Sequence, residues 1–150
     1  WIGASYIKSA RFNEAISTLQ SAIQFEPQDA TIYYYLGMAS RMSGDHAEAV
    51  EKLKKAVAID PSAEQVHYYL GLVYLDLRQY ENARDSFREA VRVKPDFADG
   101  HYMLGDMFSN ILIDPEKAIL HLRKAEKLYL KLEDYDQSAR IRQMLGHCPQ

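Results

Sequence analysis

Hydrophobic residues recur along this chain at alternating spacings of three and four, as they do in a helix with one buried face. One such stripe holds Tyr33, Leu36, Gly37 and Ser40 at positions i, i+3, i+4 and i+7. Glycine, proline and polar residues separate the stripes, so the pattern predicts an all-α chain without strands. The helices are expected at 1–9, 12–25, 30–42, 46–59, 64–77, 80–93, 98–111, 115–132 and 134–146.

The stripes themselves repeat at a fixed interval of 34 residues. The columns that share this interval include Gly3, Gly37, Gly71 and Gly105; Pro27, Pro61 and Pro95; Ala15, Ala49 and Ala83; and Ala22, Ala56 and Ala90. One extra residue between Ser109 and Pro115 restores the register of the last unit, which indicates an insertion in a turn. An interval of this length predicts stacked structural units that bury their apolar faces against one another.

The repeated glycine predicts a close contact between two helices. A glycine inside a helix costs about 1 kcal/mol relative to alanine, so its recurrence indicates that another helix packs closely there. Ala49 and Ala56 on the following helix are small enough for such a contact, and Leu53 between them fills the remaining space. We therefore expect antiparallel helix pairs.

The ends of the helices carry their own signals. Asp45 with Glu48, and Ser62 with Gln65, have the spacing of a capping box and predict two helix starts. The repeated proline follows the second helix of each unit, where its missing N–H and fixed φ stop the helix.

With these columns, the chain resembles the tetratricopeptide repeat family. The matching segments are YYYLGMAS with AEAVEKLKKAVAIDP, and HYYLGLVYLDLRQYENARDSFREAVRVKP. Tyr33, His67 and His101 stand where the family often has tryptophan, and Leu130 stands where a last proline is usual.

The resemblance implies an α-solenoid of antiparallel helix pairs that winds as a right-handed superhelix. We expect one domain over residues 1–150, with repeats at about 1–29, 30–63, 64–97 and 98–132 and a C-terminal capping helix at 134–146. Because Trp1 falls inside a predicted helix, the first repeat is expected to be truncated and to be preceded by further residues.

In the family, the first helix of each repeat lines the inner face that receives ligands. After the packing stripe is subtracted, these helices still carry large apolar residues and few charges. The candidate peptide-binding residues are Tyr34, Tyr35, Met38, Arg41, Met42, Tyr68, Tyr69, Leu72, Asp76, Tyr102, Met103 and Asp106. Some of these side chains are also expected to pack between neighbouring repeats. Tyrosine offers rigid contact area and methionine an adaptable one, so we expect a binding surface for a protein or peptide partner.

Charge and composition limit the classes of partner that the chain is expected to bind. A net charge of -3 and a pI near 6.0 disfavour nucleic acid, and no run of about 20 apolar residues predicts a membrane span. Asp76, Asp99 and Asp106 are expected toward one end of the groove, and Arg41 and Lys8 toward the other. This arrangement predicts a partner segment with apolar and basic residues. The single cysteine, Cys148, fits a reducing compartment and favours the cytoplasm weakly.

Two other functions stay open. The chain could be a structural assembly module that self-associates through an open N-terminal end at Trp1, or that packs against missing upstream repeats. It could also bind a lipid or small molecule in a closed cavity. The lysine, asparagine and arginine clamp with which some family members grip a terminal carboxylate is absent, since Tyr34, Met38, Tyr69, Asp99 and Met103 occupy the matching positions.

The sequence offers no catalytic constellation. The five histidines are not at the spacing of metal ligands, and His67 and His101 recur with the repeat, which is typical of packing residues. No glycine-rich phosphate loop is present. We therefore expect a non-enzymatic protein without a cofactor or a metal.

Overall fold

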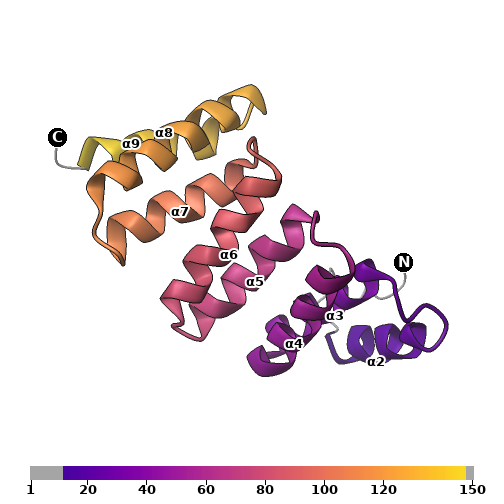
Figure 1. The fold of residues 1–150 in the computed structure, drawn as a ribbon. Coiled ribbons are helices and arrows are strands. Elements are labelled where there is room, and N and C mark those ends of the chain that lie inside the picture. Colours follow the sequence, from indigo (N-terminus) through magenta and orange to yellow (C-terminus); the bar gives the residue numbers. More distant parts are fainter. Residues whose placement is uncertain (1–11, 148–150) are drawn as a thin grey trace. The chain divides into compact units, whose positions relative to one another are not determined.

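The computed structural model describes residues 12–147, and over this range the chain is built from helices joined by short turns (Figure 1). The helices are α2 (Phe12–Ile23), α3 (Ala30–Ser43), α4 (His46–Ile59), α5 (Glu64–Asp76), α6 (Tyr80–Val93), α7 (Ala98–Asn110), α8 (Pro115–Lys131) and α9 (Tyr135–His147). Within the described range, the predicted helix starts are confirmed, apart from a shift of one residue at α9. The helix predicted at 1–9 lies outside the described residues.

The chain divides inside α6 into two compact units, Trp1–Ala83 and Arg84–Gln150, which we call unit 1 and unit 2. In unit 1, α2 packs on α3, α3 on α4, and α4 on α5; in unit 2, α7 packs on α8 and α8 on α9. These contacts join helices that follow one another in the chain, as expected for successive helix pairs.

The core of each unit contains the columns that the repeat predicts. Ala49, Leu53 and Ala56 are fully buried in unit 1, and Ala118, Leu122 and Ala125 are fully buried in unit 2. A Cβ atom added to Gly37 would lie 2.6 Å from Leu53 Cγ, and one added to Gly105 would lie 2.7 Å from Leu122 Cγ. The predicted close contact between the helices of a pair is therefore confirmed, because neither position has room for a side chain.

The three residues that stand where the family often has tryptophan make equivalent polar contacts. Tyr33 Oη donates to the carbonyl oxygen of Pro27 at 3.3 Å, and His67 Nε2 lies 2.9 Å from the same atom of Pro61. His101 Nε2 lies 3.1 Å from the carbonyl oxygen of Pro95. A carbonyl oxygen can only accept, so both histidines carry a proton on Nε2. Tyrosine and histidine thus tie the start of each first helix to the proline that closes the preceding repeat.

Capping differs between the helices. The Asp45 side chain accepts a hydrogen bond from Glu48 N at 2.9 Å and caps α4, as predicted. The expected cap from Ser62 is wrong: α5 has Ala63 at its N-cap without a side-chain hydrogen bond. Asp60 Oδ1 accepts hydrogen bonds from both N and Oγ of Ser62, at 2.9 and 2.6 Å. The Ser62 hydroxyl is therefore engaged with the residue before Pro61 and does not reach the helix.

The turn inside each helix pair contains a residue with positive φ. This residue is Gly44 (φ 91°) in the first described pair, Arg78 (φ 58°) in the next and Ile113 (φ 50°) in the last. Arg78 follows Gly44 by 34 residues and Ile113 follows Arg78 by 35, which agrees with one inserted residue before position 113.

Candidate functional site: the tyrosine face of α3 and α5

The predicted binding residues lie on three helices. Tyr34, Tyr35, Met38, Arg41 and Met42 lie on α3; Tyr68, Tyr69, Leu72 and Asp76 lie on α5; and Tyr102, Met103 and Asp106 lie on α7. Met42 and Asp76 are exposed, and the others are partly buried. The residues on α3 and α5 belong to unit 1, so these two helices carry most of the candidate site.

Four tyrosines of unit 1 form a connected aromatic cluster, which we call the tyrosine face. The rings of Tyr34 and Tyr35 have centroids 5.0 Å apart, and Tyr34 meets Tyr69 on α5 edge to face at 5.4 Å. Tyr68 meets Tyr69 edge to face at 5.7 Å. Such geometries stabilise aromatic pairs beyond the area that they bury. The rings are therefore held in place before any partner arrives, which lowers the entropy cost of binding.

The Tyr34 hydroxyl stays protonated over the physiological range. Burial raises its pKa above the ordinary value, and the nearby Tyr69 and Tyr35 and a hydrogen bond with the Tyr69 side chain add to this effect. A neutral tyrosine offers an apolar ring together with a hydroxyl that can bond a peptide backbone.

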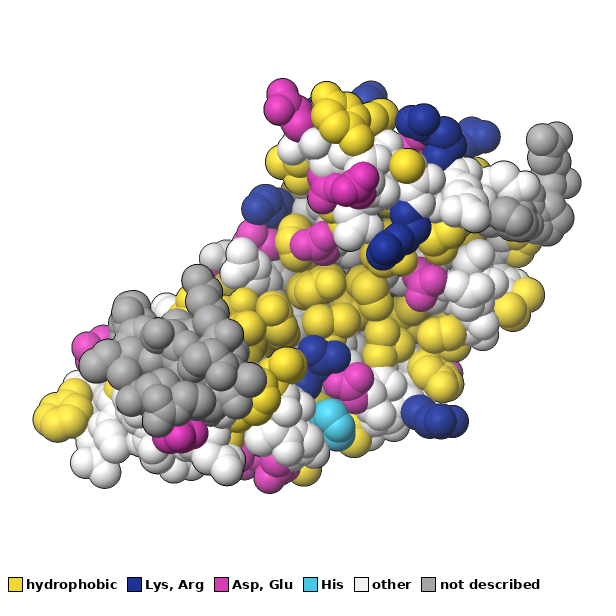
Figure 2. Space-filling view, turned by 180° about the vertical axis from the view of Figure 1, so that it is seen from behind, with side chains coloured by type: hydrophobic (Ala, Val, Ile, Leu, Met, Phe, Trp, Pro, Cys, Tyr) yellow, Lys and Arg dark blue, Asp and Glu magenta, His cyan; other side chains and the backbone are white. Residues whose placement is uncertain are grey.

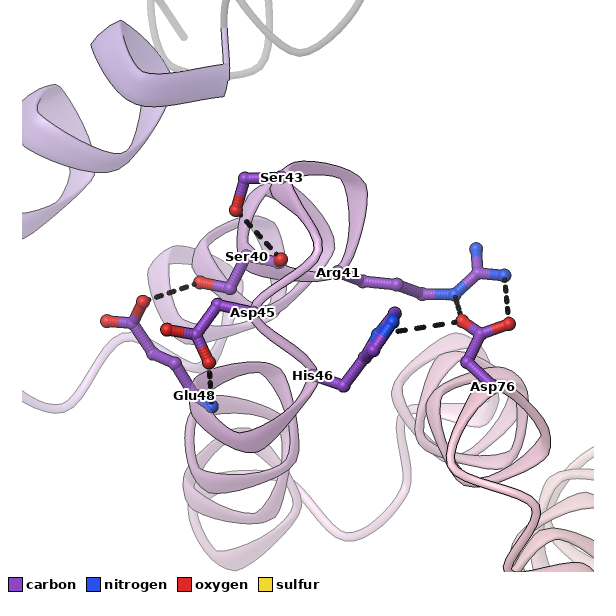
Figure 3. A network of polar contacts seen from close by, with 7 residues as sticks. All are labelled: Ser40, Arg41, Ser43, Asp45, His46, Glu48 and Asp76. Carbon is purple, nitrogen blue, oxygen red and sulfur yellow. Dashed lines mark hydrogen bonds and ion pairs between the residues drawn. The ribbon is translucent and has the colours of Figure 1, made fainter.

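A polar network next to this face changes the expected charge distribution (Figure 3). Arg41 Nε lies 2.6 Å from Asp76 Oδ2, and Arg41 Nη2 lies 3.4 Å from Asp76 Oδ1, so a bidentate ion pair joins α3 to α5. His46 Nδ1, on α4, lies 3.9 Å from Asp76 Oδ2. From the sequence, Arg41 and Asp76 were expected at opposite ends of a groove. In the structure they pair with each other, and neither acts as an isolated charge.

The other two acidic residues that were expected at the groove are also hydrogen-bonded. Asp99 accepts a hydrogen bond from the Tyr129 hydroxyl, and Asp106 Oδ1 accepts one from Asn110 Nδ2 at 2.8 Å. In the same unit, Tyr102 packs against a core cluster that includes Leu122, Tyr129 and Ile141. Two of the candidate residues of unit 2, Tyr102 and Asp106, thus make contacts within their own unit.

A pocket that the sequence did not predict lies between the first turns of α3 and α5. Its volume is about 290 Å³, and Tyr34, Tyr35, Asp60 and Glu64 are among the nine residues that line it. A second hollow of about 510 Å³ includes Glu26 and Asp29 and shares Ala30 with the first. Two acidic residues therefore line each hollow beside the tyrosine face. Sequence reasoning missed them because they lie at helix starts and in loops, outside the helical stripes.

Two histidines meet in unit 2, although their sequence spacing gave no sign of it. His101 Nδ1 lies 3.0 Å from His121 Nδ1, and the His121 ring stacks on Phe108. Burial lowers the pKa of both, that of His121 to about 4; His101 and Arg88 add to the effect on His121. Both rings therefore stay neutral at physiological pH. No third histidine, cysteine, aspartate or glutamate joins a metal-binding group anywhere in the described range.

Serine, histidine and acidic residues, the types that form hydrolase active sites, also lie near one another in Figure 3. Their hydrogen bonds do not form a catalytic arrangement. Ser40 Oγ donates to Glu48 Oε2 at 3.1 Å, and Ser43 Oγ donates to the Ser40 carbonyl oxygen at 2.9 Å. His46 Nδ1 is buried and makes no hydrogen bond with any residue that the structure describes. No serine is therefore activated by His46 here.

In the view of Figure 2, exposed hydrophobic side chains lie among acidic and basic ones. Over residues 12–147, every helix is too short or too polar to cross a bilayer. Trp1, proposed as part of an assembly end, and Lys8 lie outside the described residues.

Comparison with known proteins agrees with the fold. Among solved structures, a crystal structure of MamA matches with a TM-score of 0.80 and 25% identity, over 89% of this chain and 77% of that chain. A MamA fragment, residue 41 to the end, from Desulfovibrio magneticus RS-1 matches with a TM-score of 0.73 and 22% identity, over 98% of this chain and 90% of that one. No curated protein sequence matches the chain.

The family models identify the repeats directly. The model described as TPR repeat matches residues 3–40 and 41–78, and the one described as tetratricopeptide repeat matches residues 64–97. The chain therefore belongs to the tetratricopeptide repeat family, whose helical repeats are non-catalytic scaffolds for protein interactions.

Proposed function

We propose that this scaffold binds a peptide segment of a partner protein on the tyrosine face of α3 and α5. The observation that carries the proposal is the connected cluster of Tyr34, Tyr35, Tyr68 and Tyr69, whose rings are fixed by mutual contacts and remain partly exposed. Large aromatic side chains on a rigid scaffold are the residues that dominate binding energy at interfaces.

Neighbouring residues support a peptide rather than a rigid protein surface as the occupant. Met38 and Leu72 are partly buried and Met42 is 53% exposed, so the same two helices offer adaptable apolar contacts beside the rings. A flexible peptide loses conformational freedom when it binds. We therefore expect a dissociation constant in the micromolar range, about -8 kcal/mol.

The test uses peptides selected from a random displayed library against the whole chain. The double variant Tyr34→Ala/Tyr68→Ala should bind the selected peptides at least about tenfold more weakly, as expected for the loss of two aromatic anchors. Fluorescence anisotropy gives the affinities. Tyr135→Ala is the matched control, because Tyr135 is 65% exposed, belongs to α9 of unit 2 and makes no ring contact with the four tyrosines of this face.

Circular dichroism separates binding from folding. The double variant should keep the helical spectrum of the original chain, and a loss of helix would mean that these tyrosines belong to the core. Equal binding by the folded double variant would contradict the proposal. Light scattering in parallel tests the assembly alternative, since a monomer whose mass is independent of concentration excludes self-association.

A further inference from the structure

The pocket between α3 and α5 combines aromatic walls with negative charge. Tyr34 and Tyr35 come from α3, Glu64 comes from the first turn of α5, and Asp60 comes from the loop before it. At about 290 Å³ the pocket is near the lower limit of ligand sites, about 300 Å³. It therefore suits one long side chain better than a whole ligand.

The charge of the pocket is fixed by local hydrogen bonds. Ser62 donates from its hydroxyl and its backbone N–H to Asp60, and these bonds lower the pKa of that carboxyl group. Among the described residues that line the pocket, Asp60 and Glu64 are acidic and none is basic. Glu26 and Asp29 in the adjoining hollow add charge of the same sign. The surrounding field therefore attracts a cation.

The aromatic walls favour a cation of a particular shape. Elsewhere in this chain, Lys55 Nζ lies 4.9 Å from the centre of the Tyr33 ring, so its tyrosines already support such contacts. A guanidinium group is planar, stacks on aromatic rings and forms forked hydrogen bonds with carboxylates. Lysine shares the charge but lacks the flat surface and the fork.

We propose that this pocket receives the side chain of an arginine in the bound peptide, with its guanidinium group against Tyr34 and Tyr35 and facing Asp60 and Glu64. The inference rests on the proposed function and specifies its partner. It moves the expected contact with a basic residue from Asp76, which Arg41 occupies, to the opposite end of α5.

The experiment starts from the library-selected peptides whose binding depends on Tyr34 and Tyr68. These peptides should share an arginine, and replacing it by citrulline, which has nearly the same shape but no charge, should weaken binding roughly tenfold. The protein variant Asp60→Asn/Glu64→Gln should weaken the arginine peptide by a similar factor. It should leave the affinity for the citrulline peptide unchanged.

The protein variants are chosen to preserve the fold. Asparagine at position 60 can still accept the hydrogen bonds from Ser62, and glutamine at position 64 keeps the shape of glutamate. Glu116→Gln is the matched control, because Glu116 is an exposed glutamate in the first turn of α8. Thermal melts by circular dichroism should coincide for all three proteins.

The results separate the two proposals. Selected peptides that need the tyrosines but contain no common arginine would overturn this inference and leave the proposed function standing. Equal binding of arginine and citrulline peptides, or losses that simply add in the double-mutant cycle, would do the same. A selection that yields no tyrosine-dependent peptide would overturn both.

Discussion

In unit 1, Tyr34 and Tyr69 meet across α3 and α5 and remain part of a surface, whereas in unit 2 Tyr102 packs against a core cluster formed with α8 and α9. Tyr102 stands one repeat after Tyr68, so the two residues occupy the same column. The difference comes from the helices that pack beside each tyrosine. In unit 2, Ile141 of α9 joins the buried cluster, and α9 covers an apolar edge as the predicted capping helix should.

This contrast shows that the position of a residue in the repeat determines its burial only where its contact partner is also a repeated residue. The glycine and leucine columns touch within one helix pair, and they behave alike in both units. The tyrosine column touches whatever helix is packed beside it. Its role as a binding surface or as core therefore depends on the neighbour and not on the repeat.

The largest expected effect concerns the contact between glycine and leucine inside a helix pair, which occurs in both units. Gly37→Leu and Gly105→Leu should each lower the free energy of unfolding by about 1–3 kcal/mol, because their Cβ atoms alone would overlap Leu53 and Leu122. The two losses should be similar, since an added Cβ would also lie 3.3 Å from the backbone oxygen of Ala49 at Gly37 and 3.1 Å from the backbone nitrogen of Leu122 at Gly105. Urea denaturation measures both changes.

The control for these variants is Gly146→Ala in α9, where an added Cβ has no atom within 4 Å. It should be neutral or slightly stabilising, because alanine is the better helix former. If Gly37→Leu were as harmless as this control, the close contact inside the helix pair would be wrong.

The second prediction is that the stability of unit 2 depends more strongly on pH than that of unit 1. The His101 and His121 pKa values are lowered in the folded state, that of His121 to about 4, while an unfolded histidine titrates near 6.5. Between these values the unfolded chain binds more protons. Stability is therefore fully present above about pH 6.5 and is lost as the pH falls toward 4. We expect a loss on the order of 1 kcal/mol after allowance for solvent screening.

Hydrogen-exchange protection factors can assign this loss to a unit. Amides of α7 and α8 should lose protection between pH 7 and pH 5, whereas those of α3 and α4 should change less. His121→Asn should flatten the pH dependence, because it removes the group with the larger shift. An unchanged slope in this variant would show that the histidine pair is not responsible.

The third prediction concerns the helix starts inside unit 1. Asp45→Ala should destabilise the chain by about 1 kcal/mol, because it removes the hydrogen bond from Glu48 N that caps α4. Ser62→Ala should cost less, since Ser62 bonds Asp60 and does not cap α5. Thermal denaturation of the two variants side by side gives the order, and equal losses would restore the capping role that the sequence pattern suggested for Ser62.

These cases show which features the sequence could predict. The helix starts and the core columns depend on local chemistry and on a fixed interval, and both can be read directly from residues such as Gly37 and Leu53. The pairing of Arg41 with Asp76 was accessible as well, because Asp76 stands 35 residues after Arg41, one more than the repeat interval, and so lies near it on the next first helix. The contact between His101 and His121 was not, since the positions equivalent to His121 in the earlier repeats, Lys52 and Ser86, share no chemistry with it.

The smallest expected effect concerns the turns, where the two units again use one position differently. Gly44 has φ 91° in unit 1, and the equivalent Ile113 has φ 50° in unit 2. A left-handed conformation costs a residue with a side chain roughly 1–2 kcal/mol, and a β-branched residue is especially unsuited to it. Ile113 is 71% exposed, so its side chain contributes little buried area in return.

Ile113→Gly should therefore stabilise the chain by about 0.5 kcal/mol, because glycine removes the strain but loses more backbone entropy on folding. Gly44→Ala should have the opposite sign and cost about 1 kcal/mol. An added Cβ at Gly44 has no atom within 4 Å, so this loss would come from the backbone conformation alone. Chemical denaturation of both variants measures the pair. Changes of the same sign would mean that the turn of unit 2, with its inserted residue, relaxes differently from that of unit 1.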